Sequence, residues 1–333
     1  MGGSRPQIPH VPTMWNHGGY RRSLIGRRAR GRNGKLLLMF KKELMVAQMA
    51  AVNAGRAIMG FYATDFAVAE KQGVDCHFEP VTEADIAASS IIVNELATAF
   101  PQDAVLSEEE VDDVERRLSR DRVWIIDPLD GTAGFVRKDG DFAVQIGLAV
   151  EGVPLLGVVY LPVYDLLIYA VKGEGAFLVH EDGKPLPAKV SGRGQAGELR
   201  LAMSKNHPSP RMGRIIESFG FESLVRRGSV GLKVGLIAEQ VCDIYIHPSP
   251  RTKLWDTCAP QVILEEAGGR FTDLFGAEIR YDRLELQNQN GILATNGSAH
   301  DIAVETLRPL LAEFGRVPYI YEPFAPASSA KCV

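Results

Sequence analysis

The stretch that decides the fold is Trp124-Ile-Ile-Asp-Pro-Leu-Asp-Gly-Thr132. Its apolar beginning is typical of a buried strand, and Asp127 and Asp130 follow it three residues apart. Pro128 stiffens the turn between the two carboxylates, and Gly131 permits a sharp bend after them. Burying one carboxylate is costly, and burying two at a strand end is far worse without a cation. Carboxylate oxygens are hard ligands that suit Mg²⁺, so this stretch predicts a magnesium site.

Two further acidic segments extend the pattern. Ser107-Glu108-Glu109-Glu110 lies upstream, and Leu254-Trp255-Asp256-Thr257 lies downstream at the start of an expected helix. Each segment alone has a simpler interpretation. Asp-Pro and Asp-Gly are common turn pairs, a run of glutamates is often a solvated surface, and Asp256 alone is more often a helix cap than a ligand. Their occurrence together, in this order, favours one shared metal centre.

The rest of the chain supplies helices and strands around this centre. Apolar residues at helical spacing predict a helix over 41–63, and Thr82 and Asp85 begin a second helix, to about Ala99, in a pattern that resembles a capping box. Short apolar runs separated by turn residues then predict an antiparallel meander over 123–126, 142–150, 155–160, 166–171 and 176–179. Beyond residue 198 strands and helices alternate, which indicates a layered α/β unit. The expected strands there are 199–203, 243–246, 270–273 and 291–294, and the expected helices are 211–219, 230–239, 257–266 and 299–314.

These elements predict two packed subdomains between flexible ends. A basic N-terminal tail over 1–38 precedes an N-terminal α+β subdomain with the metal core over 39–197. A C-terminal α/β subdomain that binds the substrate follows over 198–316, and a tail rich in Pro, Ala and Ser ends the chain over 317–333. The Gly-rich segment 191–197 marks the boundary between the subdomains.

Composition and charge narrow the class of protein. The 333 residues are 46% hydrophobic and 23% charged, which is ordinary for a globular protein, and the net charge of -4 gives no reason to expect a nucleic-acid polymer as a partner. No apolar run approaches the ~20 residues that a membrane span needs. Four scattered cysteines without a CxxC pair favour a reducing cytoplasm over a disulfide framework or a zinc site. The first 35 residues are rich in arginine and free of acids, which leaves organelle targeting, a disordered tail and translated upstream sequence as alternatives.

Taken together, the motifs resemble those of the inositol-monophosphatase-like superfamily: a Glu-Glu segment at Glu108, Asp-Pro-x-Asp-Gly-Thr at Asp127 and Trp-Asp at Trp255. Two more segments fit the same resemblance, Pro80-Val-Thr-Glu-Ala-Asp85 and Glu265-Glu-Ala-Gly-Gly269. The resemblance covers nearly the whole chain outside the tails. It implies a layered αβαβα fold of the sugar-phosphatase type, with helices and an antiparallel sheet in the N-terminal half and an α/β C-terminal half. It also implies a magnesium-dependent phosphomonoesterase.

The resemblance implies a role for each residue of the metal core. Two or three Mg²⁺ ions are implied; one would be held by Glu108, Asp127 and the backbone carbonyl of Leu129, and a second by Asp127, Asp130 and Asp256. Thr132 would hydrogen-bond a water on the metal and relay its proton to Asp85. The water would then attack phosphorus in line. By sequence alone, the capping role described above is an equally good interpretation of Asp85.

The choice of substrate depends on the C-terminal half. A Gly-Ser turn that opens a helix offers backbone N–H groups to an anion, and Lys233 near that helix start is unfavourable unless something negative lies nearby. Arg251 lies close to a metal ligand in the sequence. The expected substrate-binding residues are Gly131, Thr132, Ser204, His207, Gly228, Ser229, Lys233, Arg251 and Asp256. Their segments resemble those of the 3'(2'),5'-bisphosphate nucleotidases, where such groups hold the 5'-phosphate of adenosine 3',5'-bisphosphate.

The preferred hypothesis is therefore a nucleotidase of sulfur assimilation that removes the 3'-phosphate from adenosine 3',5'-bisphosphate. Inositol monophosphatases usually carry a Glu shortly before Trp-Asp, whereas the stretch from His247 to Leu254 holds no acid, which speaks against inositol. An inositol-1-phosphate or sugar-phosphate phosphatase stays as the alternative. A catalytically silent sensor is disfavoured because the metal core is intact. The resemblance also implies a small phosphorylated molecule as the partner, inhibition by Li⁺, and a homodimer as one assembly.

Overall fold

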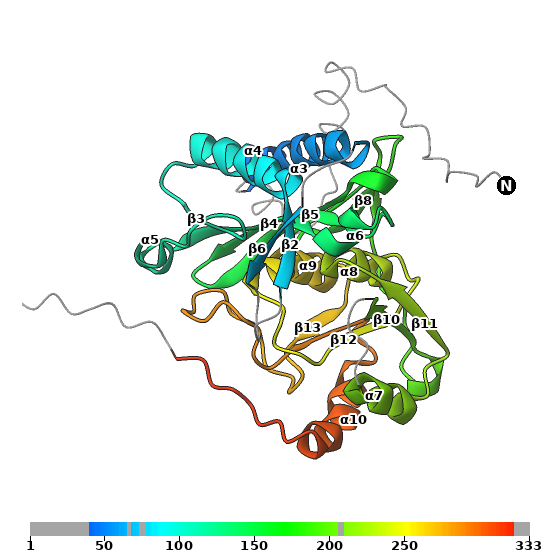
Figure 1. The fold of residues 1–333 in the computed structure, drawn as a ribbon. Helices are drawn as coiled ribbons and strands as arrows, with labels where there is room; N and C mark the ends of the chain where they lie inside the picture. Colours follow the sequence, from blue (N-terminus) through cyan, green and yellow to red (C-terminus); the bar gives the residue numbers. More distant parts are fainter. Residues whose placement is uncertain (1–39, 65–67, 73–77, 206–209, 323–333) are drawn as a thin grey trace, which may run out of the picture.

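Helices and sheets alternate through the fold in five layers (Figure 1). The computed structural model describes residues 40–64, 68–72, 78–205 and 210–322. The first layer pairs α3 (Lys41–Tyr62) with α4 (Glu83–Ala99), and the second is a seven-stranded sheet. Helices α8 (Val230–Ala238) and α9 (Leu254–Glu266) form the third layer and a five-stranded sheet the fourth, while α7 (Pro210–Phe219) packs with α10 (His300–Glu313) in the fifth. This order confirms the expected αβαβα fold.

The seven-stranded sheet contains the antiparallel meander expected from the sequence. Its strands lie in chain order: β3 (Ala104–Ser107), β4 (Arg122–Asp130), β5 (Ala143–Val150), β6 (Val153–Leu161), β7 (Leu166–Val171), β8 (Gly175–Val179) and β9 (Pro185–Pro187). Strand β3 runs parallel to β4, and every later pair is antiparallel. The central strands are buried on both faces because helices cover each side.

Apolar side chains fill the spaces between the layers in three clusters. Trp124 and Ile126 belong to the cluster of β4 with α3 and α4, whereas Val123 and Ile125 belong to the cluster of β4 with α8 and α9. Successive residues of a strand point to opposite faces, so this alternation places residue 127 on the α9 side. A third cluster lies between the five-stranded sheet and the pair α7 and α10.

Helix α3 covers the outer face of the seven-stranded sheet together with α4. Ala47, Ala50, Ala51 and Ala54 form its buried stripe, and these small side chains let it lie close to α4 and β6. By length and composition α3 is the one helix in the described ranges that could cross a membrane, a test that core helices also pass. Of the membrane-length window of α3, 39% is buried inside the fold.

Helix α9 lies in the middle of the molecule and carries Asp256 in its first turn. It packs directly on β5 and β6 because two glycines leave room for it. A Cβ at Gly147 would lie 2.5 Å from the Cys258 sulfur, and one at Gly157 would lie 2.3 Å from the Ala259 carbonyl oxygen. This close approach holds the start of α9 against the sheet that carries the other acidic residues.

The five-stranded sheet begins beyond the boundary expected near residue 198. Its strands lie in the order β11 (Ser223–Arg227), β10 (Arg200–Ser204), β12 (Ile244–His247), β14 (Ile292–Thr295) and β13 (Arg270–Thr272). Strand β10 is parallel to β11 and β12, whereas β14 is antiparallel to β12 and β13. The sequence pattern does not predict β3, β9, β11, the β1–β2 pair (Val68–Gln72 and Phe78–Thr82), α5 (Val114–Ser119) or α6 (Thr132–Val136).

Candidate active site

Three carboxylates meet where β4 ends and α9 begins. Oxygen atoms of Asp127, Asp130 and Asp256 lie within 4.8 Å of one another. Asp127 follows Ile125 on the α9 side of β4. In a regular strand Asp130 would point to the opposite face, but the register of β4 against β5 shifts between the two aspartates. The extra residue of this bulge turns both side chains to the same side of the sheet.

The surroundings of the three carboxylates favour a cation. Burial raises the pKa of Asp130, and burial together with the charges of Asp130 and Glu108 raises the pKa of Asp256 well above its usual range. The carboxylates therefore resist carrying their negative charges together unless a positive charge enters. An all-oxygen donor set of this kind fits a divalent metal ion.

Glu108 borders this cluster from the neighbouring strand. Its N–H donates to the Ile126 carbonyl at 3.2 Å, which continues the parallel pairing of β3 with β4. Glu108 is half-buried, and the charge of its side chain raises the pKa of both Asp85 and Asp256. The end of β3 thus places a fourth carboxylate beside the three aspartates.

Asp85 belongs to a helix cap and to the site at once. Its Oδ2 accepts hydrogen bonds from the N–H and the hydroxyl of Thr82, at 2.8 and 2.6 Å, in a capping box. Its Oδ1 accepts from the Thr132 hydroxyl at 3.0 Å, and that hydroxyl also lies 3.2 Å from the Leu129 carbonyl oxygen. Burial raises the pKa of Asp85, and the charge of Glu108 adds to the rise. The two sequence interpretations of Asp85 are compatible, because each uses a different carboxylate oxygen.

The start of α8 points at Asp130. Ser229 Oγ donates to Asp130 Oδ2 at 2.6 Å, and the N–H of Gly231 donates to the same oxygen at 3.0 Å. Ser229 has a φ of 33° and caps α8 by accepting from the Leu232 N–H at 3.0 Å. The Ser229 hydroxyl, an expected contact of the substrate, donates to a carboxylate of the protein in the structure.

Lys233 is buried near the carboxylates of Asp130 and Asp256 rather than exposed at an open surface. It is 3% exposed, and its ammonium donates to the carbonyls of Gly228 at 2.5 Å and Ser229 at 2.8 Å, 4.7 Å from the centre of the Tyr245 ring. Burial lowers the pKa of Lys233 to about 8, although the charge of Asp130 opposes the shift. The expectation that Lys233 faces a substrate phosphate stays a prediction; in the structure its ammonium donates to the carbonyls at the tight start of α8.

Asp141, beside the start of α8, is a buried aspartate whose charge is balanced by two cationic side chains, and no sequence pattern predicts it. Asp141 accepts from Lys205 Nζ at 2.5 Å, from Arg227 Nε at 2.6 Å and from the Gly228 N–H at 2.9 Å. Burial alone would raise the pKa of Asp141, but these hydrogen bonds lower it. Gly131, with a φ of 97°, passes so close that a Cβ would lie 2.4 Å from the Asp141 carbonyl oxygen. Since Arg227 lies 86 residues away in the chain, no local pattern marks this contact.

The remaining substrate residues expected from the sequence lie at the ends of elements. Ser204 ends β10, and Arg251 lies two residues before Lys253, the N-cap of α9; both are half-buried. His207 lies outside the described residues. The structure thus joins Thr132 with Asp85, Gly131 with the backbone of Asp141, and the start of α8 with Asp130.

Comparisons with known proteins match the chain over this whole region. The profile of the inositol monophosphatase family matches residues 41–312. The chain is 36% identical over 238 residues to the 3'(2'),5'-bisphosphate nucleotidase CysQ of Salmonella typhimurium, which covers 71% of this chain and 92% of that protein. It is 27% identical over 299 residues to the human 3'(2'),5'-bisphosphate nucleotidase 1, covering 79% of this chain and 92% of that protein.

Solved structures share the fold. An inositol monophosphatase from Thermotoga maritima superposes with a TM-score of 0.69 at 27% identity, over 82% of this chain and 99% of that one. CysQ from Bacteroides thetaiotaomicron superposes with a TM-score of 0.66 at 30% identity, over 78% of this chain and 98% of that one.

Proposed function

The chain belongs to the inositol monophosphatase family, and from that premise we propose that it is a 3'(2'),5'-bisphosphate nucleotidase of sulfur assimilation. As a member of this family it is a phosphatase that acts on a small phosphorylated molecule. The reaction proposed is removal of the 3'-phosphate from adenosine 3',5'-bisphosphate. The observation that carries the proposal is the close set of three carboxylates on a chain that matches CysQ over 71% of its length.

The metal ions proposed are two or three Mg²⁺. The oxygen donors proposed for one are Glu108, Asp127 and the Leu129 carbonyl, and those for a second are Asp127, Asp130 and Asp256. Magnesium, when bound, would neutralise phosphate charge and make a water molecule more acidic. Ser229 and Gly231 support this arrangement, because their hydrogen bonds fix the orientation of Asp130.

Asp85 and Thr132 are proposed to move the proton of the attacking water. Thr132 Oγ1 donates to Asp85 Oδ1 at 3.0 Å, so the same hydroxyl oxygen can accept a hydrogen from water while it gives its own to the carboxylate. A carboxylate whose pKa is raised by burial is a stronger base than an exposed one, which suits this task. The capping hydrogen bonds from Thr82 hold Asp85 in place for it.

The two phosphates of the substrate are proposed to lie on opposite sides of the carboxylates. The backbone at Gly131 and Thr132 would contact the phosphate that is removed. Ser204 and Arg251 would contact the second phosphate from the ends of β10 and of the loop before α9. Lys233 would act indirectly, through its positive charge and through its hydrogen bonds to the carbonyls of Gly228 and Ser229.

Phosphate release from matched substrates tests the proposal. Purified protein is given adenosine 3',5'-bisphosphate, adenosine 3'-monophosphate or inositol 1-phosphate, each with and without Mg²⁺. We expect the highest kcat/KM for the bisphosphate and no turnover without metal, with Asp127→Asn as the control for contaminating phosphatases. A higher kcat/KM for inositol 1-phosphate would move the function to an inositol monophosphatase, the activity of several proteins that share the fold.

The proposal includes the setting of the protein. A cytoplasmic location agrees with the free thiols of Cys242 and Cys258. A homodimer is the assembly to test, by light scattering of the purified chain.

A further inference from the structure

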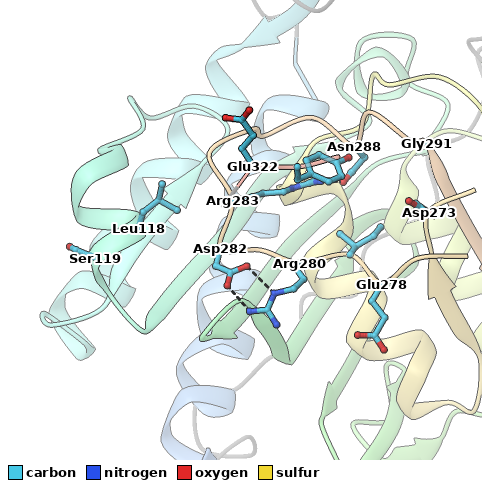
Figure 2. Close-up of a pocket in the computed structure, with 12 residues that line it drawn as sticks. Leu118, Ser119, Asp273, Glu278, Arg280, Asp282, Arg283, Asn288, Gly291 and Glu322 are labelled. Atoms are coloured by element: carbon cyan, nitrogen blue, oxygen red, sulfur yellow. Dashed lines mark hydrogen bonds and ion pairs between the residues drawn. The ribbon is translucent and has the colours of Figure 1, made fainter. Parts of the chain in front are cut away.

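A pocket of about 780 Å³ lies apart from the carboxylates, beside the loop that joins β13 to β14 and the end of the described chain (Figure 2). Arg280, Arg283 and Asn288 line it, and Figure 2 labels all three among the side chains of the lining. No residue of its lining belongs to the site described above. Its volume is in the range that holds a small metabolite.

Arg283 is the unusual group in this pocket. It is 5% exposed, its Nη2 donates to Asn288 Oδ1 at 2.6 Å, and the ring of Tyr321 covers the guanidinium at 3.8 Å. Its Nε is buried and has no hydrogen-bond partner. Within the described ranges no ion pair joins Arg283 to a carboxylate. Burial accordingly lowers the pKa of Arg283.

Arg117 contacts the backbone of Arg283 and shows how this fold neutralises a buried arginine. It is 2% exposed, and the two oxygens of Asp112 accept from its Nε and Nη2, each at 2.8 Å. Its Nη1 donates to the Arg283 carbonyl at 2.8 Å. Burying a guanidinium without a counter-charge costs several kcal/mol. Asp112 offsets that cost for Arg117, whereas no carboxylate among the described residues forms an ion pair with the neighbouring Arg283.

The acidic groups near the pocket do not fill that role. Asp282 is bound to Arg280, with contacts of 2.5 and 3.0 Å. One oxygen of Asp273 accepts two backbone N–H groups of its own turn, and a Glu285 oxygen accepts a backbone N–H at 2.8 Å. Glu278 and Glu322, the other acids of the lining, are exposed, as Asp282 is.

We propose that this pocket binds a small anion, with a phosphate or carboxylate group held at the Nε edge of Arg283. The anion takes the position that Asp112 has on Arg117, a planar two-oxygen contact for which a guanidinium is suited. Tyr321 covers the group in the structure, and its own segment is held by hydrogen bonds between Tyr319 and Asn290 at 2.7 and 3.1 Å. The anion therefore enters beside Tyr321 or displaces it.

The test reads the guanidinium itself. The full chain, labelled with ¹⁵N-arginine and saturated with Mg²⁺, is titrated with inorganic phosphate, with malonate and with sodium chloride at equal ionic strength. The Nε–Hε cross-peaks are assigned by their loss in Arg283→Lys and Arg117→Lys. We expect a saturable shift of the Arg283 cross-peak with a midpoint on the order of 1 mM, while the Arg117 cross-peak stays in place.

The probes separate the outcomes. A shift with phosphate alone identifies a phosphorylated ligand, and one with malonate alone a carboxylate. No saturable shift of the Arg283 cross-peak, or an equal shift of both arginines or with chloride, would overturn the proposal. Because phosphate also binds an active site, the readout is confined to these two cross-peaks. As a second measurement, the anion that shifts the Arg283 cross-peak should raise the melting temperature of the wild type by more than that of Arg283→Met.

Discussion

Asp127→Asn should leave the protein folded and more stable in metal-free buffer, yet inactive. Asp127 is 1% exposed, and its oxygens lie within 4.8 Å of those of Asp130 and Asp256. At an effective dielectric constant of about 20, two unit charges at that separation repel by about 3.5 kcal/mol. Because burial raises the pKa values of Asp130 and Asp256, protonation of either carboxylate would relieve part of this repulsion. The net gain from the substitution is therefore about 1–3 kcal/mol, since a neutral amide also keeps the shape of the side chain.

The measurement is thermal unfolding with chelator and with Mg²⁺. For a domain of this size about 1 kcal/mol corresponds to roughly 2–4 °C, so Asp127→Asn should melt several degrees above wild type in chelator. Saturating metal should stabilise the wild type by about 3 kcal/mol at a hundredfold excess over its dissociation constant, and should stabilise the variant little. The order of the two melting temperatures should then reverse. Turnover should fall by ~10²-fold or more.

Asp141→Asn is the matched control. Asp141 is also buried, but two cations and a backbone N–H surround it. Its loss should cost about 2–4 kcal/mol in both buffers and keep the stabilisation by metal. The reasoning fails if Asp127→Asn is destabilised in chelator, if it keeps the stabilisation by metal, or if it keeps more than about a tenth of wild-type turnover.

Further substitutions separate the other roles. His300 is buried between two threonine hydroxyls, and burial lowers its pKa to about 4 from 6.5; its stabilisation is therefore complete above pH 6.5 and is lost as the pH falls toward 4. Urea unfolding at pH 7 and pH 5 should show that His300→Gln loses less stability on acidification than wild type, by about 2 kcal/mol, and equal losses would contradict this. Arg251→Ala should raise KM for adenosine 3',5'-bisphosphate by ~10- to 100-fold and leave adenosine 3'-monophosphate nearly unchanged. Lys233→Met should instead lower kcat on both substrates by similar factors, because Lys233 holds the turn that binds Asp130; steady-state kinetics on both variants would expose a reversed pattern. Asn288→Ala should weaken magnesium affinity about 10-fold in a metal titration followed by melting temperature, because the Asn288 amide donates to the Lys253 carbonyl at 3.0 Å and the Lys253 N–H holds Asp256. Unchanged affinity would remove that role.

The parts of the site that sequence reasoning finds are those set by local chemistry. Thr82 and Asp85 form a cap within three residues, so their pattern is visible in the sequence and the structure confirms the cap. The acidic stretch at the end of β4 is local as well. The bulge that turns Asp130 to the side of Asp127 is not, because it depends on pairing with β5. The sequence therefore indicates which carboxylates are candidates for binding a metal ion, but it does not show why the side chains of Asp127 and Asp130 lie on the same side of the sheet.

The parts that it misses depend on distant partners. Strands β3, β9 and β11 have three to five residues each, too few for a periodic pattern, and exist because neighbouring strands pair with them. Lys233 is missed for a different reason. Its position at a helix start predicts an anion nearby, and Asp130 is near, but its ammonium donates to the carbonyls of Gly228 and Ser229, five and four residues earlier in the chain. The sequence does not show that this turn is buried with the ammonium folded back onto it.

The carboxylate cluster can exist before metal binds because two helix starts face it. Ser229 and Gly231, at the start of α8, donate to Asp130, and the Lys253 N–H, at the start of α9, donates to Asp256 at 2.6 Å. Helix N-termini carry partial positive charge, and Lys233 adds a whole one. These contacts replace part of the water that the carboxylates lose on burial, so the cluster does not need metal in order to fold. Removal of metal should therefore lower the melting temperature without unfolding the chain at room temperature, in contrast to small domains whose metal supplies most of the folding energy.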